Sequence, residues 1–361
     1  MAKANIIGLG RSGIAAARVL KRDGWDVILS DRANNESLQA MGKPLEKEDI
    51  QLDLGRQLTL DRSDLPQLIV VSPGVPWDLP ALVQAREKGI DVIGELELAW
   101  RYLKSTPWVG ITGTNGKTTT TALINAIFKA AGLNAPACGN IGYAACELVL
   151  QNQSFDWIIA EVSSYQIESS PELAPKIGLW TTFTPDHLSR HKTLENYYSI
   201  KASLLKRSKL QIFNGDDAHL ASVGQQEWND AYWTSVQGKD QLLCEPAKGV
   251  YLQDNWVCAF GELILPINLF KMVGRHNQQN LLMGTAAARL AKIDKKSITD
   301  AIAIFSGVSH RLERICTIKG VDFINDSKAT NYDAAAVGLA SVSSPVIPVS
   351  YTHLTLPTNR E

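Results

Sequence analysis

Residues 110–121, which read GITGTNGKTTTT, combine glycines, a lysine and hydroxyl side chains in a pattern suited to holding phosphate. A glycine-rich turn between a strand and a helix directs backbone N–H groups at an anion, and the helix dipole adds to the attraction. Lys117 could reach the outer phosphates of a nucleoside triphosphate, and the Thr118 hydroxyl could bind Mg²⁺. The common G-x-x-x-x-G-K-[ST] spacing is not met, because the first glycines are Gly110 and Gly113. We therefore interpret the stretch as a variant phosphate loop, with a glycine turn beside a solvated lysine as the alternative.

A second glycine-rich turn lies near the N-terminus, where GLGRSG fits the pattern G-x-G-x-x-G. Asp31 ends the next strand-like run, and this combination is typical of a dinucleotide site that holds diphosphate and ribose. The match also fits a tight strand-to-helix turn that needs glycine for its backbone alone. The sequence thus indicates a ribose or diphosphate site and leaves the ligand open.

Polar side chains follow two later apolar runs. Glu161 ends DWIIAE, and Asp186 and His187 follow WTTFTP. Ligands gather at the carboxyl ends of strands in open α/β sheets, and carboxylates near a phosphate loop suit Mg²⁺. Glu161 and His187 are therefore candidate metal ligands, with ordinary strand-end caps as the alternative. Lys201, inside ENYYSIKASLL, is by default a solvated helix lysine.

Three further polar stretches come later in the chain. Asn277 and Asn280 lie three residues apart at a helix start, so they share one face of that helix. SHRLE and NDSKATN adjoin apolar strand-like runs. Each of these polar stretches could be part of a ligand-binding site or an ordinary loop.

The elements that must position these residues alternate between strand-like and helix-like runs, which predicts an α/β fold with parallel sheets and helices on both faces. The pattern starts again at TPWVGITGT, so we place a domain boundary near residue 96. A hairpin with a tight Lys-Gly turn is predicted for RICTIKGVDFINDS. The other expected strands are ANIIGLG, WDVILSD, LIVVSPG, DWIIAEVSS, IGLWTTFTPD and KLQIFNGDD, and the expected helices are SGIAAARVLKRDG, which ends at Gly24, and NQQNLLMGTAAARLAKI.

Composition narrows the possible partners. The 361 residues carry a formal net charge of -1 and no dense Lys/Arg run, which argues against nucleic acid or a membrane as the main partner. We find no signal peptide and no membrane span at the sequence level. The 5 cysteines are scattered and odd in number, without C-x-x-C spacing, as expected for reduced thiols in a cytoplasmic protein.

Seven stretches together resemble one family. They are GTNGKTT, GNIG, EVSSYQIE, TPDHLSRH, GRHNQQN, SHRLE and NDSKATN, and they occur in the order and spacing of the Mur ligases over residues 1 to about 347. GLGRSG and DSKATN favour the member that adds D-glutamate to UDP-N-acetylmuramoyl-L-alanine. The resemblance implies a Rossmann-like UDP-binding domain at 1–95, a central P-loop-type ATP-binding domain at 96–305, and the start of a third, Rossmann-like amino-acid-binding domain at 306–347.

The resemblance also implies roles for individual residues. Residues matching the UDP pocket are Arg11, Ser12, Asp31, Ser72, Pro73 and Gly74, those for the muramoyl end are Asn140, Gln166 and His187, and those near the amino acid are Lys328 and Thr330. Residues matching the ATP site are Gly113, Thr114, Asn115, Gly116, Lys117, Thr118, Thr119, Asn277, Asn280, Arg311 and Asp326. Two Mg²⁺ ions are implied, one on Thr118 and Glu161 and one on His187 and a carbamylated Lys201. Lys117, His187 and Lys201 are the implied catalytic residues.

The implied reaction belongs to peptidoglycan precursor synthesis in the cytoplasm. ATP phosphorylates the substrate carboxylate, the amine of D-glutamate attacks the acyl phosphate, and phosphate leaves as the amide forms. The expected partners are these small molecules, without nucleic acid or membrane, and the expected state is a monomer.

The third domain has barely begun before PVSYTHLTLPTNRE at 348–361, which has no helical period and two prolines. We expect this segment to be a non-native tail, with a native disordered tail as the alternative. The chain as written is then expected to bind the UDP-sugar, with ATP as a further ligand, and to show little or no ligase activity.

Three other functions fit parts of the pattern. A folylpolyglutamate-type ligase shares the phosphate loop but begins near it, without the N-terminal glycine turn. An NAD-dependent oxidoreductase would explain GLGRSG and Asp31 but leaves Lys117 without a role. A UDP-sugar-binding protein without ligase activity is the non-enzyme alternative.

Overall fold

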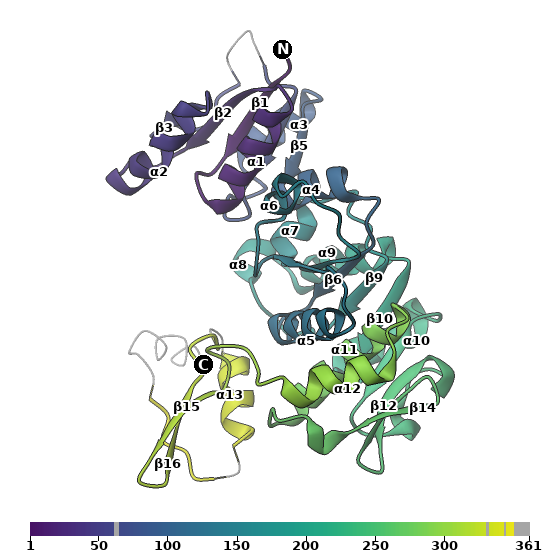
Figure 1. The fold of residues 1–361 in the computed structure, drawn as a ribbon. Coiled ribbons are helices and arrows are strands. Elements are labelled where there is room, and N and C mark those ends of the chain that lie inside the picture. The colour runs from purple at the N-terminus through teal and green to yellow at the C-terminus, as the bar shows by residue number, and fades with distance from the viewer. Residues whose placement is uncertain (61–64, 330–331, 343, 350–361) are drawn as a thin grey trace. The chain divides into compact units, whose positions relative to one another are not determined.

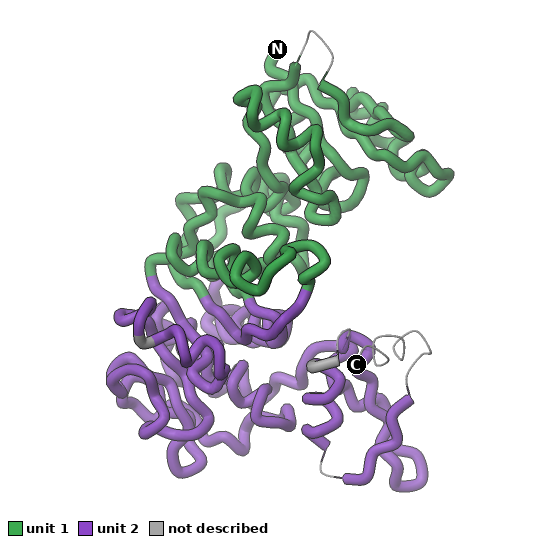
Figure 2. The backbone as a smooth tube through the Cα atoms, turned by 180° about the vertical axis from the view of Figure 1, so that it is seen from behind, with its two compact units in different colours: residues 1–112, 134–178, 187–209 green, residues 113–133, 179–186, 210–361 purple. Residues whose placement is uncertain are grey.

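The computed structural model describes residues 1–60, 65–329, 332–342 and 344–349 (Figure 1). Thr330 and most of the expected non-native tail lie outside these residues. The chain divides into two compact units (Figure 2): unit 1 holds residues 1–112, 134–178 and 187–209, and unit 2 holds 113–133, 179–186 and 210–361. The predicted α/β architecture is confirmed in both units.

Unit 1 begins with a five-stranded parallel sheet in the order β3-β2-β1-β4-β5. Its strands are β1 (Lys3–Ile7), β2 (Asp26–Asp31), β3 (Gln51–Leu54), β4 (Leu68–Val71) and β5 (Asp91–Gly94). The strand order reverses between β1 and β4, which pair in register from Ala4 with Leu68 to Ile7 with Val71. Such a reversal opens a crevice at the carboxyl ends of the two strands, where ligands bind in this fold class.

Four helices accompany this sheet: α1 (Arg11–Arg22), α2 (Glu36–Lys47), α3 (Pro80–Glu87) and α4 (Glu95–Leu103). Helix α1 buries a continuous apolar stripe that includes Ala15, Ala16, Val19 and Leu20. It stops just before Gly24, which has a φ of 81°. Glycine adopts this left-handed conformation without strain because it has no Cβ. The predicted helix and its end are therefore confirmed.

The rest of unit 1 contains three short parallel strands and four helices. The strands are β6 (Trp108–Thr112), β7 (Ala137–Gly139) and β8 (Ile158–Glu161), and the helices are α6 (Ala145–Leu150), α7 (Ser164–Glu168), α8 (Leu188–His191) and α9 (Leu194–Arg207). Every residue of β6 and β8 is buried, as expected for central parallel strands covered on both faces. The strand predicted from DWIIAEVSS is confirmed as β8.

Unit 2 contains α5 (Lys117–Ala130), which packs against α11 (Arg275–Leu290) and α12 (Lys295–Ile304). Helix α11 also lies against β10 (Leu210–Asn214), β11 (Tyr232–Ser235) and β12 (Gly249–Gln253). The remaining elements are α10 (Ala218–Glu227), β13 (Trp256–Ala259), β14 (Glu262–Pro266), β15 (Glu313–Ile318), β16 (Val321–Asn325), α13 (Tyr332–Ala340), and the 3₁₀ turns Lys239–Gln241, Pro246–Lys248 and Ile267–Leu269.

With β9 (Ile177–Trp180), the strands after β5 and before β15 form a sheet in the order β14-β13-β12-β11-β10-β9-β6-β8-β7. Its antiparallel end, β12 to β14, was not predicted. Two-residue turns join these strands, with φ positive at Asp254 and Asn255 and again at Phe260 and Gly261. Positive φ at both positions matches the twist of a hairpin.

Two other sequence predictions can be compared with the structure. The hairpin from RICTIKGVDFINDS is confirmed as β15–β16, with Lys319 and Gly320 at positive φ in its turn. All five cysteines fall within the described residues and are free thiols. Within the described ranges, none of the helices has the length and apolar character that a membrane crossing requires.

Candidate functional site

The N-terminal glycine turn closes tightly against the end of β4. Gly8 has a φ of 103°, and a Cβ there would lie 2.8 Å from the Cβ of Ser72. A Cβ at Gly13 would lie 2.0 Å from the carbonyl oxygen of Gly8. These two glycines are therefore explained by the turn itself, since any side chain would force strand and helix apart.

Two other glycines in this region have no such explanation. A Cβ at Gly10 or Gly74 would meet no atom of the described residues within 4 Å, and neither residue has a left-handed φ. Both lie beyond the carboxyl ends of β1 and β4. Glycine at such a place lets a diphosphate approach the backbone closely. The backbone at these two glycines is thus open to close approach by a ligand.

Asp31 and Ser72 form hydrogen bonds with the N-terminal glycine turn. The Asp31 carboxylate accepts hydrogen bonds from the backbone N–H of Leu9 and of Ala33, both at 2.9 Å. Ser72 Oγ donates to the carbonyl oxygen of Gly8 at 3.1 Å. Of the other residues predicted to bind UDP here, Ser12 is half-buried in α1, and Pro73 directly follows Ser72.

Arg11 makes a contact that the sequence did not predict. Its guanidinium forms a two-pronged ion pair with Glu147 in α6, at 2.8 and 2.7 Å, and donates to the carbonyl oxygen of Gly142 at 2.8 Å. The hydrogen bonds that Arg11 donates to the Glu147 carboxylate raise the pKa of Arg11. Arg11 thereby ties the N-terminal turn to the GNIG loop of residues 139–142.

Glu161 ends β8 with its side chain almost completely buried, at 1% exposure. One carboxylate oxygen, Oε1, accepts a hydrogen bond from Asn140 Nδ2 at 2.8 Å. The other, Oε2, is buried and has no hydrogen-bond partner among the described residues. A buried carboxylate oxygen without a donor is costly, and a bound cation removes that cost. This residue therefore fits the role of a magnesium ligand.

Lys201 is not the solvated helix lysine that was the default interpretation. It is 1% exposed, its Nζ lies 3.4 Å from Thr112 Oγ1, and it sits 4.7 Å from the ring centre of Tyr197. Lysine is almost never fully buried without a specific reason. That default is wrong because α9 turns this residue toward the end of β6 instead of toward solvent.

A stack of rings runs beside the two candidate ligands His187 and Lys201. His187 lies 5.2 Å from Tyr165, Tyr165 stacks on His191 at 5.4 Å, and His191 stacks on Tyr197 at 5.2 Å. Sequence reasoning did not single out His191 or the two tyrosines. Nothing in their spacing shows a stack that joins α7, α8 and α9, since these helices are separate in sequence.

Gln166, predicted to face the muramoyl group, is 3% exposed in α7. Its Oε1 accepts hydrogen bonds from the backbone N–H and the hydroxyl of Ser163, at 3.0 and 2.9 Å. Ser163 Oγ in return accepts from the N–H of Gln166. This reciprocal pair caps the helix and fixes the orientation of the SSYQIE segment.

In unit 2 the phosphate loop wraps around its own lysine. Lys117 Nζ donates to the carbonyl oxygens of Gly113 and Thr114, both at 2.8 Å. Gly113 and Gly116 have φ values of 149° and 85°. A Cβ at Gly113 would lie 2.0 Å from the Thr181 hydroxyl. The loop conformation therefore requires both glycines and leaves the N–H groups at the start of α5 pointing outward from the helix, as an anion needs.

The rest of this loop is anchored by threonines. Thr114 Oγ1 donates to the carbonyl oxygen of Thr184 at 3.0 Å, and the N–H of Asn115 donates to Thr182 Oγ1 at 2.8 Å. Thr119, also predicted to touch ATP, is buried in the first turn of α5. These contacts make the loop rigid before any ligand binds.

The structure brings Asn277 and Asn280 onto one face of α11 beside this loop. Asn280 Nδ2 lies 3.4 Å from Asn277 Oδ1, and Asn280 Oδ1 accepts from Thr120 Oγ1 at 3.2 Å. A Cβ at Gly116 would lie 2.7 Å from the same Asn280 oxygen. The predicted shared face is therefore confirmed, and Asn280 braces the phosphate loop.

Arg311 and Asp326 come from the segments around β15 and β16. Arg311 Nη2 donates to Thr118 Oγ1 at 3.3 Å, and its Nε is buried with no hydrogen-bond partner among the described residues. Asp326 accepts from the N–H of Leu312 at 3.1 Å. Burial lowers the pKa of nearby His276, a residue of the GRHNQQN stretch that sequence reasoning left without a role. Lys328 is exposed.

A metal site made only of conventional side chains is not apparent. Over the described parts of the chain, no group of three or more His, Cys, Asp and Glu side chains could hold a metal ion. The candidate ligands predicted from the sequence are instead a glutamate, a histidine and a lysine in unit 1 and a threonine in unit 2. Such a set needs water, phosphate or a modified lysine to complete the coordination of Mg²⁺.

Comparison with protein families gives two matches. Residues 2–94 match the N-terminal domain of MurD-like Mur ligases, and residues 111–288 match the Mur ligase middle domain. The UDP-N-acetylmuramoylalanine–D-glutamate ligase of Microcystis aeruginosa is 73% identical over 350 residues, which cover 97% of this chain and 78% of the relative. The ligase of the same name from Synechocystis sp. is 70% identical over 352 residues, with the same coverage.

Solved structures share the fold at much lower identity. The pseudomurein peptide ligase type C of Methanothermus fervidus has a TM-score of 0.58 at 22% identity, covering 96% of this chain and 78% of that protein. UDP-N-acetylmuramate-alanine ligase MurC of Thermotoga maritima has a TM-score of 0.59 at 20% identity, covering 94% of this chain and 77% of that protein.

Proposed function

Because the chain belongs to the Mur ligase family, we propose that it joins D-glutamate to UDP-N-acetylmuramoyl-L-alanine in an ATP-dependent step of peptidoglycan precursor synthesis. The observation that carries this proposal is identity of 70% or more, across almost the entire chain, to ligases of that name. Mur ligases use ATP and Mg²⁺, and the geometry of both units fits these ligands.

The chemistry explains why a ligase needs such residues. A carboxylate is a poor acyl donor, because its oxygen would have to leave as oxide. Transfer of the γ-phosphoryl group of ATP to the carboxylate gives an acyl phosphate, in which phosphate is a good leaving group. The amine of D-glutamate then attacks, and phosphate departs as the amide forms. Holding the reactants in line supplies a large part of the rate.

In unit 1, the crevice between β1 and β4 is the proposed site of the UDP group. The open space beside Gly10 and Gly74 supports a diphosphate there, and Asp31 is proposed to bind the ribose. Asn140 and Gln166 are proposed to face the muramoyl end. Both are already oriented, Asn140 by Glu161 and Gln166 by Ser163.

The proposed magnesium ligands in unit 1 are Glu161, His187 and Lys201, and the proposed ligand in unit 2 is Thr118. The partnerless Oε2 of Glu161 supports this assignment. Carbamylation of Lys201 by CO₂ would replace the amine by an anionic ligand. The burial of the Lys201 side chain keeps this group away from bulk water. When bound, Mg²⁺ neutralises the charge that develops on the transferring phosphoryl group.

In unit 2, the phosphate loop is the proposed site of the ATP phosphates, with Lys117 on the transferring group. Asn277, Asn280, Arg311 and Asp326 are proposed to hold the rest of the nucleotide. The partnerless Nε of Arg311 supports an anionic ligand there. Lys328 and Thr330 are proposed to lie near D-glutamate, Thr330 being outside the described residues.

The remaining parts of the proposal concern the whole chain. Its domains are proposed to be 1–95 for UDP, 96–305 for ATP and 306–347 as part of an amino-acid-binding domain. A monomer in the cytoplasm is proposed, with small molecules as the only partners.

Calorimetric titration of the chain with UDP-N-acetylmuramoyl-L-alanine, followed by measurement of ADP formation, tests the function. We expect saturable binding of the UDP-sugar and no binding of NADH. ADP formation that requires D-glutamate and is not supported by L-glutamate would establish the ligase reaction, and Lys117→Ala should abolish it. Because little or no ADP formation is expected of the chain as written, binding of the UDP-sugar without any binding of ATP and Mg²⁺ is the result that would favour the UDP-sugar-binding alternative.

A further inference from the structure

The segment from Ser72 to Leu79, which follows β4, is held at its far end by two arginines. The first is Arg86 in α3. Its guanidinium lies 4.5 Å above the ring of Trp77, and its Nη2 donates to the Trp77 carbonyl oxygen at 3.0 Å. This contact is local, because α3 begins at Pro80, directly after the segment.

The second arginine comes from far away in the sequence. Arg190 Nη1 lies 2.9 Å from Asp78 Oδ1, and its Nη2 donates to Glu168 Oε2 at 2.8 Å. The Arg190 side chain is 17% exposed, that of Glu168 21%, and that of Asp78 61%. One rigid guanidinium fork thus joins the segment after β4 to the end of α7.

Arg190 shares a single helical turn with His187. The N–H groups of Arg190 and His191 donate to the His187 carbonyl oxygen at 2.9 and 3.0 Å. His187 itself has a φ of 53°, an uncommon conformation that its surroundings must hold in place. The ion pairs of Arg190 therefore hold the same helical turn that carries the His187 ring.

The contacts of Arg190 line a small cavity at the end of β4. Ser72, Pro73, Tyr165 and Arg190 are among the residues that surround it. Burial raises the pKa of Glu168, while the charge of Arg190 lowers it. A charge-assisted pair in such a partly dry place is stronger than an exposed surface pair.

We infer that Arg190 is a positioning residue that holds the Ser72–Leu79 segment ready for the UDP-sugar and links it to the turn that carries His187. The inference rests on the proposed function, since it assigns the Ser72–Leu79 segment to that substrate. It adds that the segment depends on an ion pair at Asp78, which need not touch substrate. Loss of the pair frees the segment and raises the entropy cost of binding.

The test is Asp78→Asn, which removes the link to the segment but leaves Arg190 paired with Glu168. Because Asp78 is largely exposed, the melting temperature should change little. Calorimetry should show binding of UDP-N-acetylmuramoyl-L-alanine weakened about five- to tenfold. The affinity for ATP with Mg²⁺ should stay within about twofold of wild type. Asp91→Asn is the matched control, because Asp91 is also an exposed carboxylate paired with an arginine. It lies at the amino end of β5, whereas the Ser72–Leu79 segment follows the carboxyl end of the parallel strand β4.

A double-mutant cycle separates positioning from general stability. In an Arg190→Met background, Asp78→Asn should have no further effect on UDP-sugar affinity, since the pair is already lost. An Asp78→Asn variant that binds the UDP-sugar as tightly as wild type would overturn the inference and leave the proposed function intact. Failure of the wild-type chain to bind the UDP-sugar would overturn the proposed function itself.

Discussion

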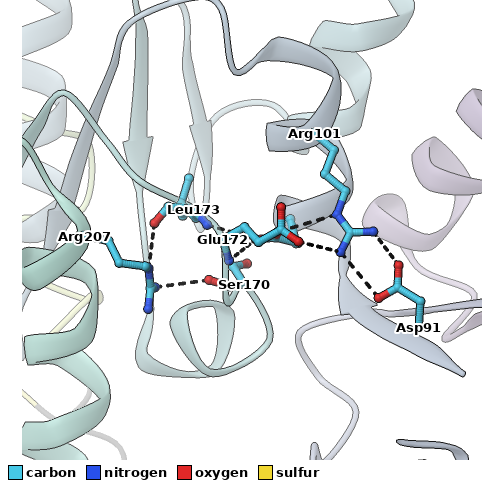
Figure 3. A network of polar contacts seen from close by, with 7 residues as sticks. Asp91, Arg101, Ser170, Glu172, Leu173 and Arg207 are labelled. Carbon is cyan, nitrogen blue, oxygen red and sulfur yellow. Dashed lines mark hydrogen bonds and ion pairs between the residues drawn. The ribbon is translucent and has the colours of Figure 1, made fainter. Parts of the chain in front are cut away.

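Glu97 in α4 should make the stability of the protein depend on pH. Its side chain is fully buried, and Oε2 accepts hydrogen bonds from the backbone N–H of Glu172 and Leu173 at 3.3 and 3.1 Å. Its nearest cation is Arg101, whose Nε lies 3.6 Å from Oε1 and which also binds Asp91 and Glu172 (Figure 3). Burial outweighs these contacts and raises the pKa of Glu97 from 4.5 to about 7.

Whether stability rises or falls with pH depends on which state, folded or unfolded, binds the proton of Glu97 more tightly. Because the pKa of Glu97 is higher in the folded chain, folding favours the protonated form, and its contribution to stability is fully present below pH 4.5. That contribution is lost as the pH rises through about 7. The whole shift corresponds to about 3 kcal/mol, of which about 2 kcal/mol is lost between pH 5.5 and pH 8.

Glu97→Gln isolates this effect in urea unfolding at pH 5.5 and pH 8. Glutamine can still accept from the two backbone N–H groups, so the variant should lie within about 1 kcal/mol of wild type at pH 5.5. At pH 8 the wild-type protein should have lost about 2 kcal/mol more than the variant. Glu95, whose pKa burial also raises to about 7, titrates in both proteins and cancels in the comparison.

Glu172→Gln is the control, since it removes an exposed carboxylate from the same network, and its pH profile should run parallel to that of wild type. Parallel profiles for wild type and Glu97→Gln would refute the reasoning. They would show that Arg101 and the two N–H groups keep Glu97 charged despite its burial.

Three further changes test the proposed ligand sites. An added Cβ in Gly10→Ala meets no atom of the described residues within 4 Å, but Gly10 is the N-cap of α1, so stability should fall by no more than about 1 kcal/mol. UDP-sugar affinity in calorimetry should fall at least about tenfold, and unchanged affinity would argue against diphosphate at this turn. An alanine at Gly116 is strained at the φ of 85°, and its Cβ crowds Asn280. Gly116→Ala should therefore lower the free energy of unfolding by about 1–3 kcal/mol and weaken ATP binding. An unaffected ATP affinity would contradict the assignment of this loop to ATP. With ¹³C-labelled bicarbonate, NMR should detect a carbamate carbon in wild type that is missing in folded Lys201→Arg, and its absence from wild type would refute carbamylation.

Much of the fold could be predicted because its signals are local. The apolar runs of β6 and β8 and the alanine stripe of α1 each specify their own element. The Lys319-Gly320 turn does the same for its hairpin. The β12–β14 hairpins were missed because Asp254-Asn255 and Phe260-Gly261 are weaker turn signals than Asn-Gly or Asp-Gly.

The site was only partly predictable, because several of its contacts join segments far apart in sequence. Arg11 and Glu147 are separated by 136 residues, and no local pattern marks either as a partner of the other. Lys201 lies in a helix whose polar composition suggests exposure, and only the packing of α9 buries it. Motifs thus supply the candidate site residues, whereas the partners of these residues depend on tertiary structure.

Two buried polar atoms without hydrogen-bond partners among the described residues support the proposed ligand sites. Among the described residues, Glu97 Oε1 and Arg101 Nε lack hydrogen bonds, but they face each other at 3.6 Å and compensate by charge. Glu161 Oε2 in unit 1 and Arg311 Nε in unit 2 have no such counterpart. The first is an acceptor that a cation would satisfy, and the second is a donor that an anion would satisfy. Keeping these two atoms buried costs folding free energy, which a bound magnesium ion at Glu161 and a bound phosphate group at Arg311 would offset.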